Sequence, residues 1–344
     1  MKKLLIISII FILLGALIAF IALIGVGFNF SKFEKTKSES FSLTEEINSI
    51  EIVTDDTGID VIIREGTEDT ASISAYYNEK YTLTYSVTDG KLTVAAVDNG
   101  NFLLNMIDFF VSDGTLTLTL PKKTYESLTA NVSTGDVTVQ GLTLSGDLSI
   151  DASTADLKLS SVKAASVSLK VSTGKIDVNR ASSLGAFTVN CSTGGVSLEG
   201  ITASSLKIEA STADIDVERA TLGDIESIRT STGEVDLSEV YTSGSASLTA
   251  NTDSISIEDS LFMGKLTVNT SSADLKVENS DAYELEITTS SGHVRMNLLT
   301  AKNFVTETSS GKVDVIGTIY TSPLCKIKTS SGDIKVRIGA EAED

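Results

Sequence analysis

The chain alternates short apolar runs with polar corners at an almost constant period. The seven-residue pattern Ser-Ser/Thr-Gly/Ala-x-apolar-x-apolar begins at Ser133 and recurs until Ser330, once in a degenerate form at Asn251. Its eleven copies start 19 to 21 residues apart. Each period also contains a second alternating run, as in residues 167–171. Alternation with period two is typical of β-strands that bury one face, so each period predicts two short strands separated by corners.

A unit of this size cannot form a hydrophobic core alone, so neighbouring units must stack and bury their inward side chains against one another. We therefore predict an all-β protein, a parallel single-stranded β-helix or β-solenoid with about 20 residues per rung. The preference for right-handed crossovers favours a right-handed coil. A column of Gly or Ala, which includes Gly135, Ala155 and Gly174, is expected to mark a tight corner. The hydroxyl side chains before it, such as Thr134 and Thr154, are expected to stack along the axis.

The two ends of the predicted stack differ from its middle. Residues 41–120 alternate with looser spacing and contain two relatives of the heptapeptide, at Thr88 and Ser112, which indicates that the solenoid begins before the regular repeats. Between them, the apolar residues 102–111 are expected to plug the first rung; the alternative is a loop that contacts the membrane or a partner subunit. At the other end, Lys335 and Arg337 are expected to lie in the last rung, where charge discourages the pairing of sheet edges.

Residues 4–28 contain no charged side chain, and 25 residues of helix are long enough to cross the roughly 30 Å hydrocarbon layer of a bilayer. We predict a single-pass transmembrane anchor that is not cleaved, because the segment is longer than a signal-peptide core and carries no convincing cleavage site. Lys2 and Lys3 favour a cytoplasmic N-terminus, which places the C-terminal part outside the cell. The predicted organisation is a cytoplasmic tip (1–3), the anchor (4–28), a tether (29–40), an N-terminal β region and cap (41–120), the regular solenoid (121–338) and an acidic tail (339–344).

Composition limits the chemistry that this architecture can carry. The chain of 344 residues has 46 acidic and 27 basic side chains, a formal net charge of −19, which argues against nucleic-acid binding because phosphate neutralisation requires clustered Lys and Arg. A single histidine and two cysteines exclude a histidine-rich metal site and a four-thiolate zinc site. Cys191 and Cys325 fall in inward slots seven rungs apart, so both are predicted to be buried free thiols.

The strongest candidate for a ligand site is a patch of four carboxylates on two adjacent rungs, formed by Asp214, Asp216, Glu234 and Asp236. Like charges about 5 Å apart across a ladder repel each other, and a calcium ion, which prefers oxygen ligands, would relieve the repulsion. The alternative is a solvated acidic face that Arg219 or Arg229 compensates. Calcium at this patch is the one cofactor that the sequence suggests.

Parallel β-solenoids also include enzymes that act on polysaccharides, so an enzyme is the competing prediction. Such an enzyme needs a concave groove lined by carboxylates with Arg or Lys, flanked by long loops. Rungs of 19 to 21 residues leave no insertion from which to build such walls. His293 lies at a corner without evident catalytic partners and is expected to be a surface residue. We therefore predict no catalytic residues, and the acidic patch is the only cluster that could supply a dyad.

The order of an N-terminal anchor, loose strands, the segment LTLTLPKK at residues 116–123 and repeated STGD or SSGD rungs resembles the bacterial "putative adhesin" family, a cell-surface domain of unknown function that includes LiaG-like proteins. The resemblance covers roughly residues 41–338. It implies a β-solenoid that is non-enzymatic, exposed at the cell surface and often associated with envelope-stress systems. No catalytic residue is defined for that family, and a fold does not by itself establish a function.

Together, these observations predict a membrane-anchored extracellular scaffold or adhesin-like interaction module. Its expected partners are a cell-envelope protein or a cell-wall polymer, besides the membrane that holds the anchor. A polysaccharide-active β-helix enzyme is the alternative.

Overall fold

The computed structural model describes residues 36–55, 57–98 and 114–339, which form β-strands joined by turns and contain no helix. Within these ranges, no helix has the length and the apolar character needed to cross a membrane. The predicted anchor at residues 4–28, the apolar segment at residues 102–111 and the tail after residue 339 lie outside the described residues.

The strands before the regular repeats are β1 (Thr36–Leu43), β2 (Ser49–Thr54), β3 (Asp60–Glu65), β4 (Ala71–Asn78), β5 (Tyr81–Thr88), β6 (Lys91–Asp98) and β7 (Gly114–Leu120). The strands of the first repeats are β8 (Thr124–Tyr125), β9 (Ser127–Thr134), β10 (Val137–Gln140), β11 (Thr143–Leu144), β12 (Asp147–Thr154), β13 (Leu157–Ala164), β14 (Ser166–Ser183), β15 (Ala186–Glu199), β16 (Thr202–Glu218) and β17 (Thr221–Thr230). The strands of the later repeats are β18 (Val235–Ser238), β19 (Tyr241–Thr242), β20 (Ala246–Ala250), β21 (Ile255–Glu258), β22 (Leu261–Thr270), β23 (Leu275–Thr288), β24 (Val294–Leu298), β25 (Asn303–Glu307), β26 (Val313–Val315), β27 (Leu324–Lys328) and β28 (Ile334–Ile338).

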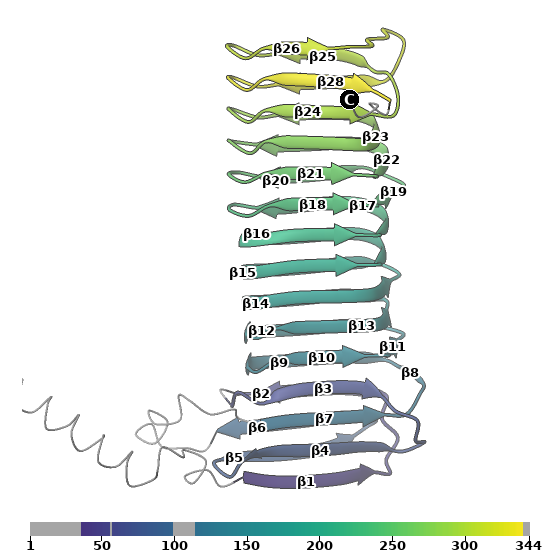
Figure 1. Cartoon of the computed structure of the whole chain (residues 1–344). Helices are drawn as coiled ribbons and strands as arrows, with labels where there is room; N and C mark the ends of the chain where they lie inside the picture. The colour runs from purple at the N-terminus through teal and green to yellow at the C-terminus, as the bar shows by residue number, and fades with distance from the viewer. Residues whose placement is uncertain (1–35, 56, 99–113, 340–344) are drawn as a thin grey trace, which may run out of the picture.

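These strands stack one above another in a tall column (Figure 1), and two long ladders run along its length. In the leading ladder, the first strand of each rung pairs in parallel with its neighbours, as Leu148 does with Val167. In the heptapeptide ladder, the strand that ends each heptapeptide does the same, as Leu157 does with Ile176. The predicted solenoid with about 20 residues per turn is therefore confirmed, and equivalent side chains form columns parallel to its axis.

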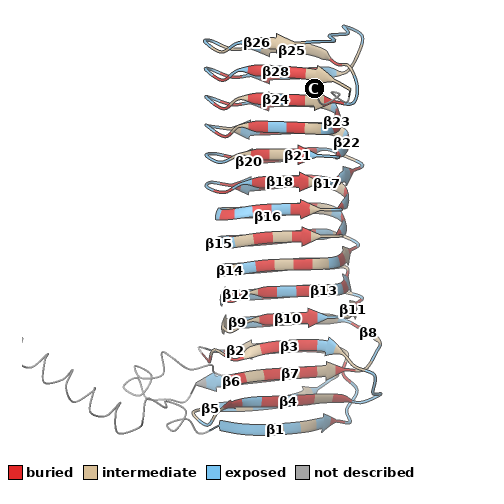
Figure 2. Ribbon diagram, in the orientation of Figure 1, coloured by how far each residue is buried: buried red, intermediate tan, exposed pale blue. Residues whose placement is uncertain are grey.

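One apolar core runs along the inside of the column. Buried and exposed positions alternate along the strands (Figure 2): Leu157 and Leu159 are buried, whereas Lys158 between them is exposed. The buried apolar side chains of the described strands belong to one continuous cluster. Burial of a Val, Leu or Ile side chain contributes about 1.5–3 kcal/mol, and each inward side chain obtains it from the rungs on both sides of its own.

At the N-terminal end, the order of rungs in space differs from their order in the sequence. β2 and β3 lie between β6 and β7 on one side and β9 and β10 on the other. Antiparallel pairs then close this end, because β4 pairs with β7, β1 with β4, and β5 with β6. Rungs therefore do precede the regular repeats, as expected, and antiparallel strands cap them.

The C-terminal end contains a second exchange. β27 and β28 lie between β23 and β24 on one side and β25 and β26 on the other. The prediction that Lys335 and Arg337 protect the open edge is therefore wrong, because β25 and β26 form that edge among the described strands. The inward residues explain the exchange: Cys325 and Ile327 are fully buried, whereas the outermost rung places Thr306 in register with Ile327. The exchange thus covers Ile327 on both sides and leaves Thr306 on the outermost rung.

Both cysteines lie in the inward slots that the repeat predicts. Cys191 stacks between Val171 and Ala210, and Cys325 stacks on Leu285. Following the pairing from Phe187 to Cys325 gives six steps rather than the expected seven, because β27 is inserted one position earlier. Burial raises the pKa of the Cys191 thiol, and it raises the pKa of Cys325 to about 12. Both are therefore protonated and act as small apolar side chains.

The corners before and after each heptapeptide strand need unusual backbone angles. At the corner before it, Gly174 and Gly194 have φ angles of 139°, which confirms the expected role of the Gly column. At the corner after it, residues of varied type adopt left-handed angles, with φ of 55° at Ser161, 59° at Arg180 and 53° at Arg219. No fixed residue type marks this second column in the sequence, although Gly141 also belongs to it.

Gly194 and its neighbour provide a matched test of the corner. A Cβ at position 194 would lie 1.9 Å from the carbonyl oxygen of Gly174, at a φ of 139°, whereas a Cβ at position 195 would find its nearest neighbour at 3.9 Å. Gly194→Ala is expected to lower stability by about 1–3 kcal/mol from backbone strain alone, before the clash is counted. Gly195→Ala is expected to change it by less than about 0.5 kcal/mol. Thermal melting followed by circular dichroism measures both, and equal effects would contradict the proposed corner geometry.

Candidate functional site

Aspartates at the corners before the heptapeptide ladder hold neighbouring rungs together. The backbone N–H of Asp136 donates to Asp60 Oδ1 at 2.9 Å, that of Asp156 donates to Asp136 Oδ1 at 2.9 Å, and that of Lys175 donates to Asp156 Oδ1 at 2.8 Å. The adjacent threonine column also stacks as expected, with the hydroxyl oxygens of Thr193 and Thr212 at 3.3 Å. These polar groups therefore contribute to the fold by joining each rung to the next.

His293 belongs to the same corner ladder. Its backbone N–H donates to Asp274 Oδ1 at 2.7 Å, and its Nδ1 accepts a hydrogen bond of 3.0 Å from the backbone N–H of Asp333. Asp333 Oδ1 in turn accepts from the backbone N–H of Lys312 at 2.7 Å. The imidazole thus replaces a carboxylate as the acceptor between β24 and the inserted β28, and its position is explained by this structural hydrogen bond.

The structure brings the four residues of the predicted calcium patch onto two paired strands. Asp216 on β16 and Asp236 on β18 are direct neighbours in the heptapeptide ladder. Asp214 Oδ1 accepts a hydrogen bond of 3.0 Å from the backbone N–H of Glu234, and the Glu234 carboxylate accepts one from the hydroxyl of Ser254. In the described ranges, no group of three or more His, Cys, Asp or Glu side chains is arranged to hold a metal ion. Calcium binding at this patch stays a prediction.

The two arginines that could compensate the patch differ in position. Arg219 forms ion pairs with Glu218 and Glu199 in the neighbouring column. Arg229 lies in the leading ladder, in register with Glu209, and so belongs to the other ladder. The like charges of the patch therefore retain an electrostatic cost. Burial, followed by the charge of Glu218, raises the pKa of Asp216.

The pKa of Asp236 is raised in the same way. Burial is the largest cause, and the charges of Glu234, Asp216 and Asp214 add to it. The folded chain consequently binds more protons than the unfolded chain in the pH window just above the ordinary aspartate range. Stability contributed by this pair therefore rises as the pH falls through that window, and ionisation near neutral pH opposes folding.

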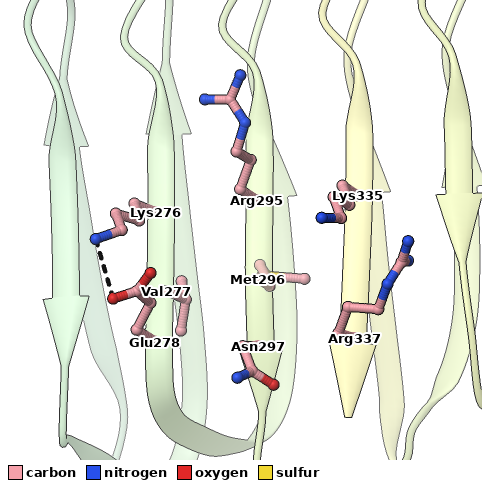
Figure 3. Close-up of a pocket in the computed structure, with 8 residues that line it drawn as sticks. All are labelled: Lys276, Val277, Glu278, Arg295, Met296, Asn297, Lys335 and Arg337. Carbon is pink, nitrogen blue, oxygen red and sulfur yellow. Dashed lines mark ion pairs between the residues drawn. The ribbon is translucent and has the colours of Figure 1, made fainter. Parts of the chain in front are cut away.

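A second charged cluster lies in the same outward column nearer the C-terminal end. Lys276 on β23, Arg295 on β24 and Lys335 on β28 are direct neighbours in the ladder. Arg337 follows two residues further along β28. Together with Val277, Glu278, Met296 and Asn297, they line a shallow groove on the side of the solenoid (Figure 3). We call these four cationic side chains and their groove the basic groove.

The basic side chains keep a net positive charge in this groove. Lys276 Nζ lies 3.0 Å from Glu278 Oε2, the one carboxylate among the lining residues. Arg337 Nη2 donates to Asp314 Oδ2 at 2.7 Å, and this hydrogen bond holds the pKa of Asp314 below its ordinary value. Arg295 lies 3.9 Å from Asp274, a looser contact. The lining itself contains four cations and one carboxylate, with Asp314 and Asp274 beyond it as partners, so the groove is locally basic on a chain whose net charge is −19.

Sequence reasoning did not find this cluster because it depends on the inserted rung. In sequence order, Asp314 separates Arg295 from Lys335, and the column reads as mixed charge. In space, β28 pairs directly with β24, and Asp314 on β26 lies on its far side. The available signal was the polar Thr306 at an inward position where the last repeat has Ile327, which favours the doubly covered place for the last repeat.

The acidic pair yields a test of its raised pKa values. Asp216→Asn combined with Asp236→Asn is expected to raise the melting temperature near neutral pH, because it removes two charges whose ionisation opposes folding. The gain should shrink as the pH falls towards the ordinary aspartate range, because the wild-type carboxyls become protonated at higher pH than free aspartates do. Asp177→Asn is the matched control, since its ladder neighbours are Lys158 and Ser197. A gain of equal size for the control would contradict the argument.

Calcium can be tested on the same proteins. A calcium titration is expected to raise the melting temperature of the wild-type chain and to leave the Asp216→Asn/Asp236→Asn variant unchanged, because the ion needs the paired carboxylate oxygens. No shift in the wild-type protein would exclude a calcium site at this patch.

Comparison with solved structures finds matches of low sequence identity. A "putative adhesin" from Parabacteroides distasonis is 16% identical, with 76% of this chain and 97% of that chain covered and a TM-score of 0.40. Proteins of the same description from Bacteroides fragilis and Parabacteroides merdae are 14% and 15% identical, with TM-scores of 0.28 and 0.29. Each of these two comparisons covers 89% of this chain and 97% of the other.

No protein with a curated description matches the chain. The family model described as Toastrack DUF4097, a domain of unknown function, matches residues 47–263 and 227–344. These two ranges overlap and together cover the β region from residue 47 onward, which confirms the resemblance seen in the sequence. The chain therefore belongs to the Toastrack DUF4097 family.

Proposed function

We propose that the chain is a non-enzymatic interaction module, displayed at the cell surface, that binds an envelope protein or a cell-wall polymer along the side of its solenoid. The observation that carries this proposal is the distribution of its polar side chains. Those at the corners join one rung to the next, as Asp136 and His293 do. On the outward side of the heptapeptide ladder, Asp216 and Asp236 form an acidic zone, and Lys276, Arg295 and Lys335 lie together in the basic groove.

Display at the surface rests on the sequence. The uncharged residues 4–28 are long enough for a membrane anchor, and Lys2 and Lys3 favour a cytoplasmic N-terminus. An anchored rod of stacked rungs holds its side faces away from the bilayer, where a polymer or a protein in the envelope can reach them. A link to envelope stress remains what the family resemblance suggests.

The arrangement offers little support for a polysaccharide-active enzyme. General acid and base catalysis requires carboxylates placed on both sides of the scissile bond. The basic groove contains a single carboxylate, Glu278, which is paired with Lys276 at 3.0 Å. Its lining residues come from β23, β24 and β28 of one ladder, so strands and not long loops form its sides.

Isolated cell walls provide the test. The purified full-length chain in detergent micelles is expected to co-sediment with the walls in a saturable manner and to be displaced by excess unlabelled chain. The walls should release no new reducing ends, unsaturated sugars or smaller fragments during the incubation, because no bond is cleaved.

The outcomes separate the two functions. Release of fragments that depends on protein concentration would favour the polysaccharide-active enzyme. Binding that does not saturate, or that unlabelled chain does not displace, would contradict an interaction module.

A further inference from the structure

We infer that the basic groove binds a linear polymer in which phosphate groups alternate with hydroxyl-bearing units. This inference rests on the proposed function and specifies its ligand class. It is argued from the spacing of the four cations, from the charge that surrounds them and from one buried acceptor in the groove.

The spacing of the cations fits an extended chain. Lys276, Arg295 and Lys335 occupy the same column on three paired strands. Paired strands lie about 4.8 Å apart, so the three charges follow the solenoid axis over roughly 10 Å. A single small anion contacts cations that converge on one point, whereas a row of cations matches successive charges along a polymer.

The charges need a counter-charge that the protein supplies only in part. Lys276 and Arg337 have carboxylate partners at 3.0 Å and 2.7 Å, and Arg295 has one at 3.9 Å. Lys335 is exposed and lies in register with Asp314, whose pKa its charge helps to lower, but it forms no direct ion pair or hydrogen bond with the described side chains. Three like charges in direct register repel one another, and a polyanion laid across them would remove that cost.

The side chains also suit phosphate. Arginine presents a planar fork of N–H donors that matches phosphate oxygens, and lysine acts as a point charge beside it. Arg337 is held in place by hydrogen bonds from Nη1 to the carbonyl oxygen of Val336 at 2.9 Å and from Nη2 to Asp314 at 2.7 Å. An ordered guanidinium beside the groove lowers the entropy cost of recognition.

A buried acceptor indicates the second chemical group of the ligand. Asn297 lines the groove and lies in register with Arg337 on β28. Its Oδ1 is buried and has no hydrogen-bond partner among the described residues. An unsatisfied buried acceptor costs about 1–3 kcal/mol, and a ligand donor would satisfy it once the Asn297 side chain turns its oxygen towards the groove. A phosphate has no hydrogen to donate when ionised, but a hydroxyl group between two phosphates does.

The acidic zone limits the length of polymer that can bind. Ser256 separates Lys276 from Asp236 in the same column, and Asp216 follows. A polyanion that continued along the axis would meet these carboxylates. The groove therefore accommodates a short stretch of charge, or a longer polymer that crosses the face obliquely.

Poly(glycerol phosphate) is the probe that combines both groups. The full-length chain is expected to bind it more tightly than inorganic polyphosphate, which lacks hydroxyl groups, and more tightly than polyglutamate. Fluorescence anisotropy with labelled polymers measures the affinities. Arg295→Gln combined with Lys335→Gln is expected to weaken binding by about tenfold or more, because charge-assisted hydrogen bonds are lost. The slope of log affinity against log salt should fall by about 1.4, from two lost phosphate contacts.

Two further variants make the test specific. Lys158→Gln combined with Lys163→Gln removes the same charge from exposed positions on β13 and should leave binding unchanged. Asn297→Ala should remove the preference for poly(glycerol phosphate) over polyphosphate while polyphosphate binding persists. Melting curves for each variant exclude unfolding as the cause.

Several results would overturn the inference. One is an equal loss of polymer affinity in the Lys158→Gln/Lys163→Gln control, and another is an equal affinity for polyglutamate. Displacement of the polymer by orthophosphate at the same phosphate concentration would also contradict it. So would self-association of the chain that the Arg295→Gln/Lys335→Gln variant abolishes. Saturable binding of cell walls by the Arg295→Gln/Lys335→Gln variant would overturn this inference alone and leave the proposed function standing. If the wild-type chain does not bind cell walls, the proposed function itself is contradicted.

Discussion

The contact between inward apolar side chains of successive rungs is the interaction on which the rest of the structure depends. A rung of about 20 residues has two short strands and no interior of its own, so burial is available only from its neighbours. This constraint fixes the register, because a slip of one residue would turn the whole inward set to the solvent. It also fixes the corners, where Gly174 and Gly194 lie so close to the preceding rung that a Cβ would meet a carbonyl oxygen at 1.9 Å.

Because the register is fixed, each position of the repeat forms a column along the axis. A residue type that recurs at one position is therefore stacked on copies of itself in neighbouring rungs. An aspartate at the corner becomes a ladder of hydrogen bonds, since each carboxylate accepts from the backbone of the next rung, as Asp136 and Asp156 do. The same geometry places like charges side by side. After burial and the charge of Glu234, the charge of Asp216 adds to the raised pKa of Asp236, and three cations in one column create a local field opposite in sign to the net charge of the chain.

How much of this could be predicted depends on whether a feature is set by the period or by the order of rungs. The period determines which residues point inward, so the burial of Cys191 and the Gly corner followed from the sequence. It does not determine which rung lies beside which. At both ends the chain places a later or earlier rung inside its neighbours, and at the C-terminal end this gives the doubly covered position to Ile327 rather than to Thr306. The left-handed backbone at the Arg180 corner could not be predicted for another reason: no single residue type marks that position in the repeats.

The inserted C-terminal rung also couples the basic groove to the fold. Arg295 on β24 and Lys335 on β28 become neighbours only when β28 pairs with β24. Arg337 then ties the inserted strand to Asp314 on the outermost rung. A ligand that contacts both Arg295 and Lys335 would bind only this arrangement, so its binding free energy would add to the stability of the insertion. Conversely, any change that displaces β28 would separate the cations and remove the site, even though every residue of the groove was still present.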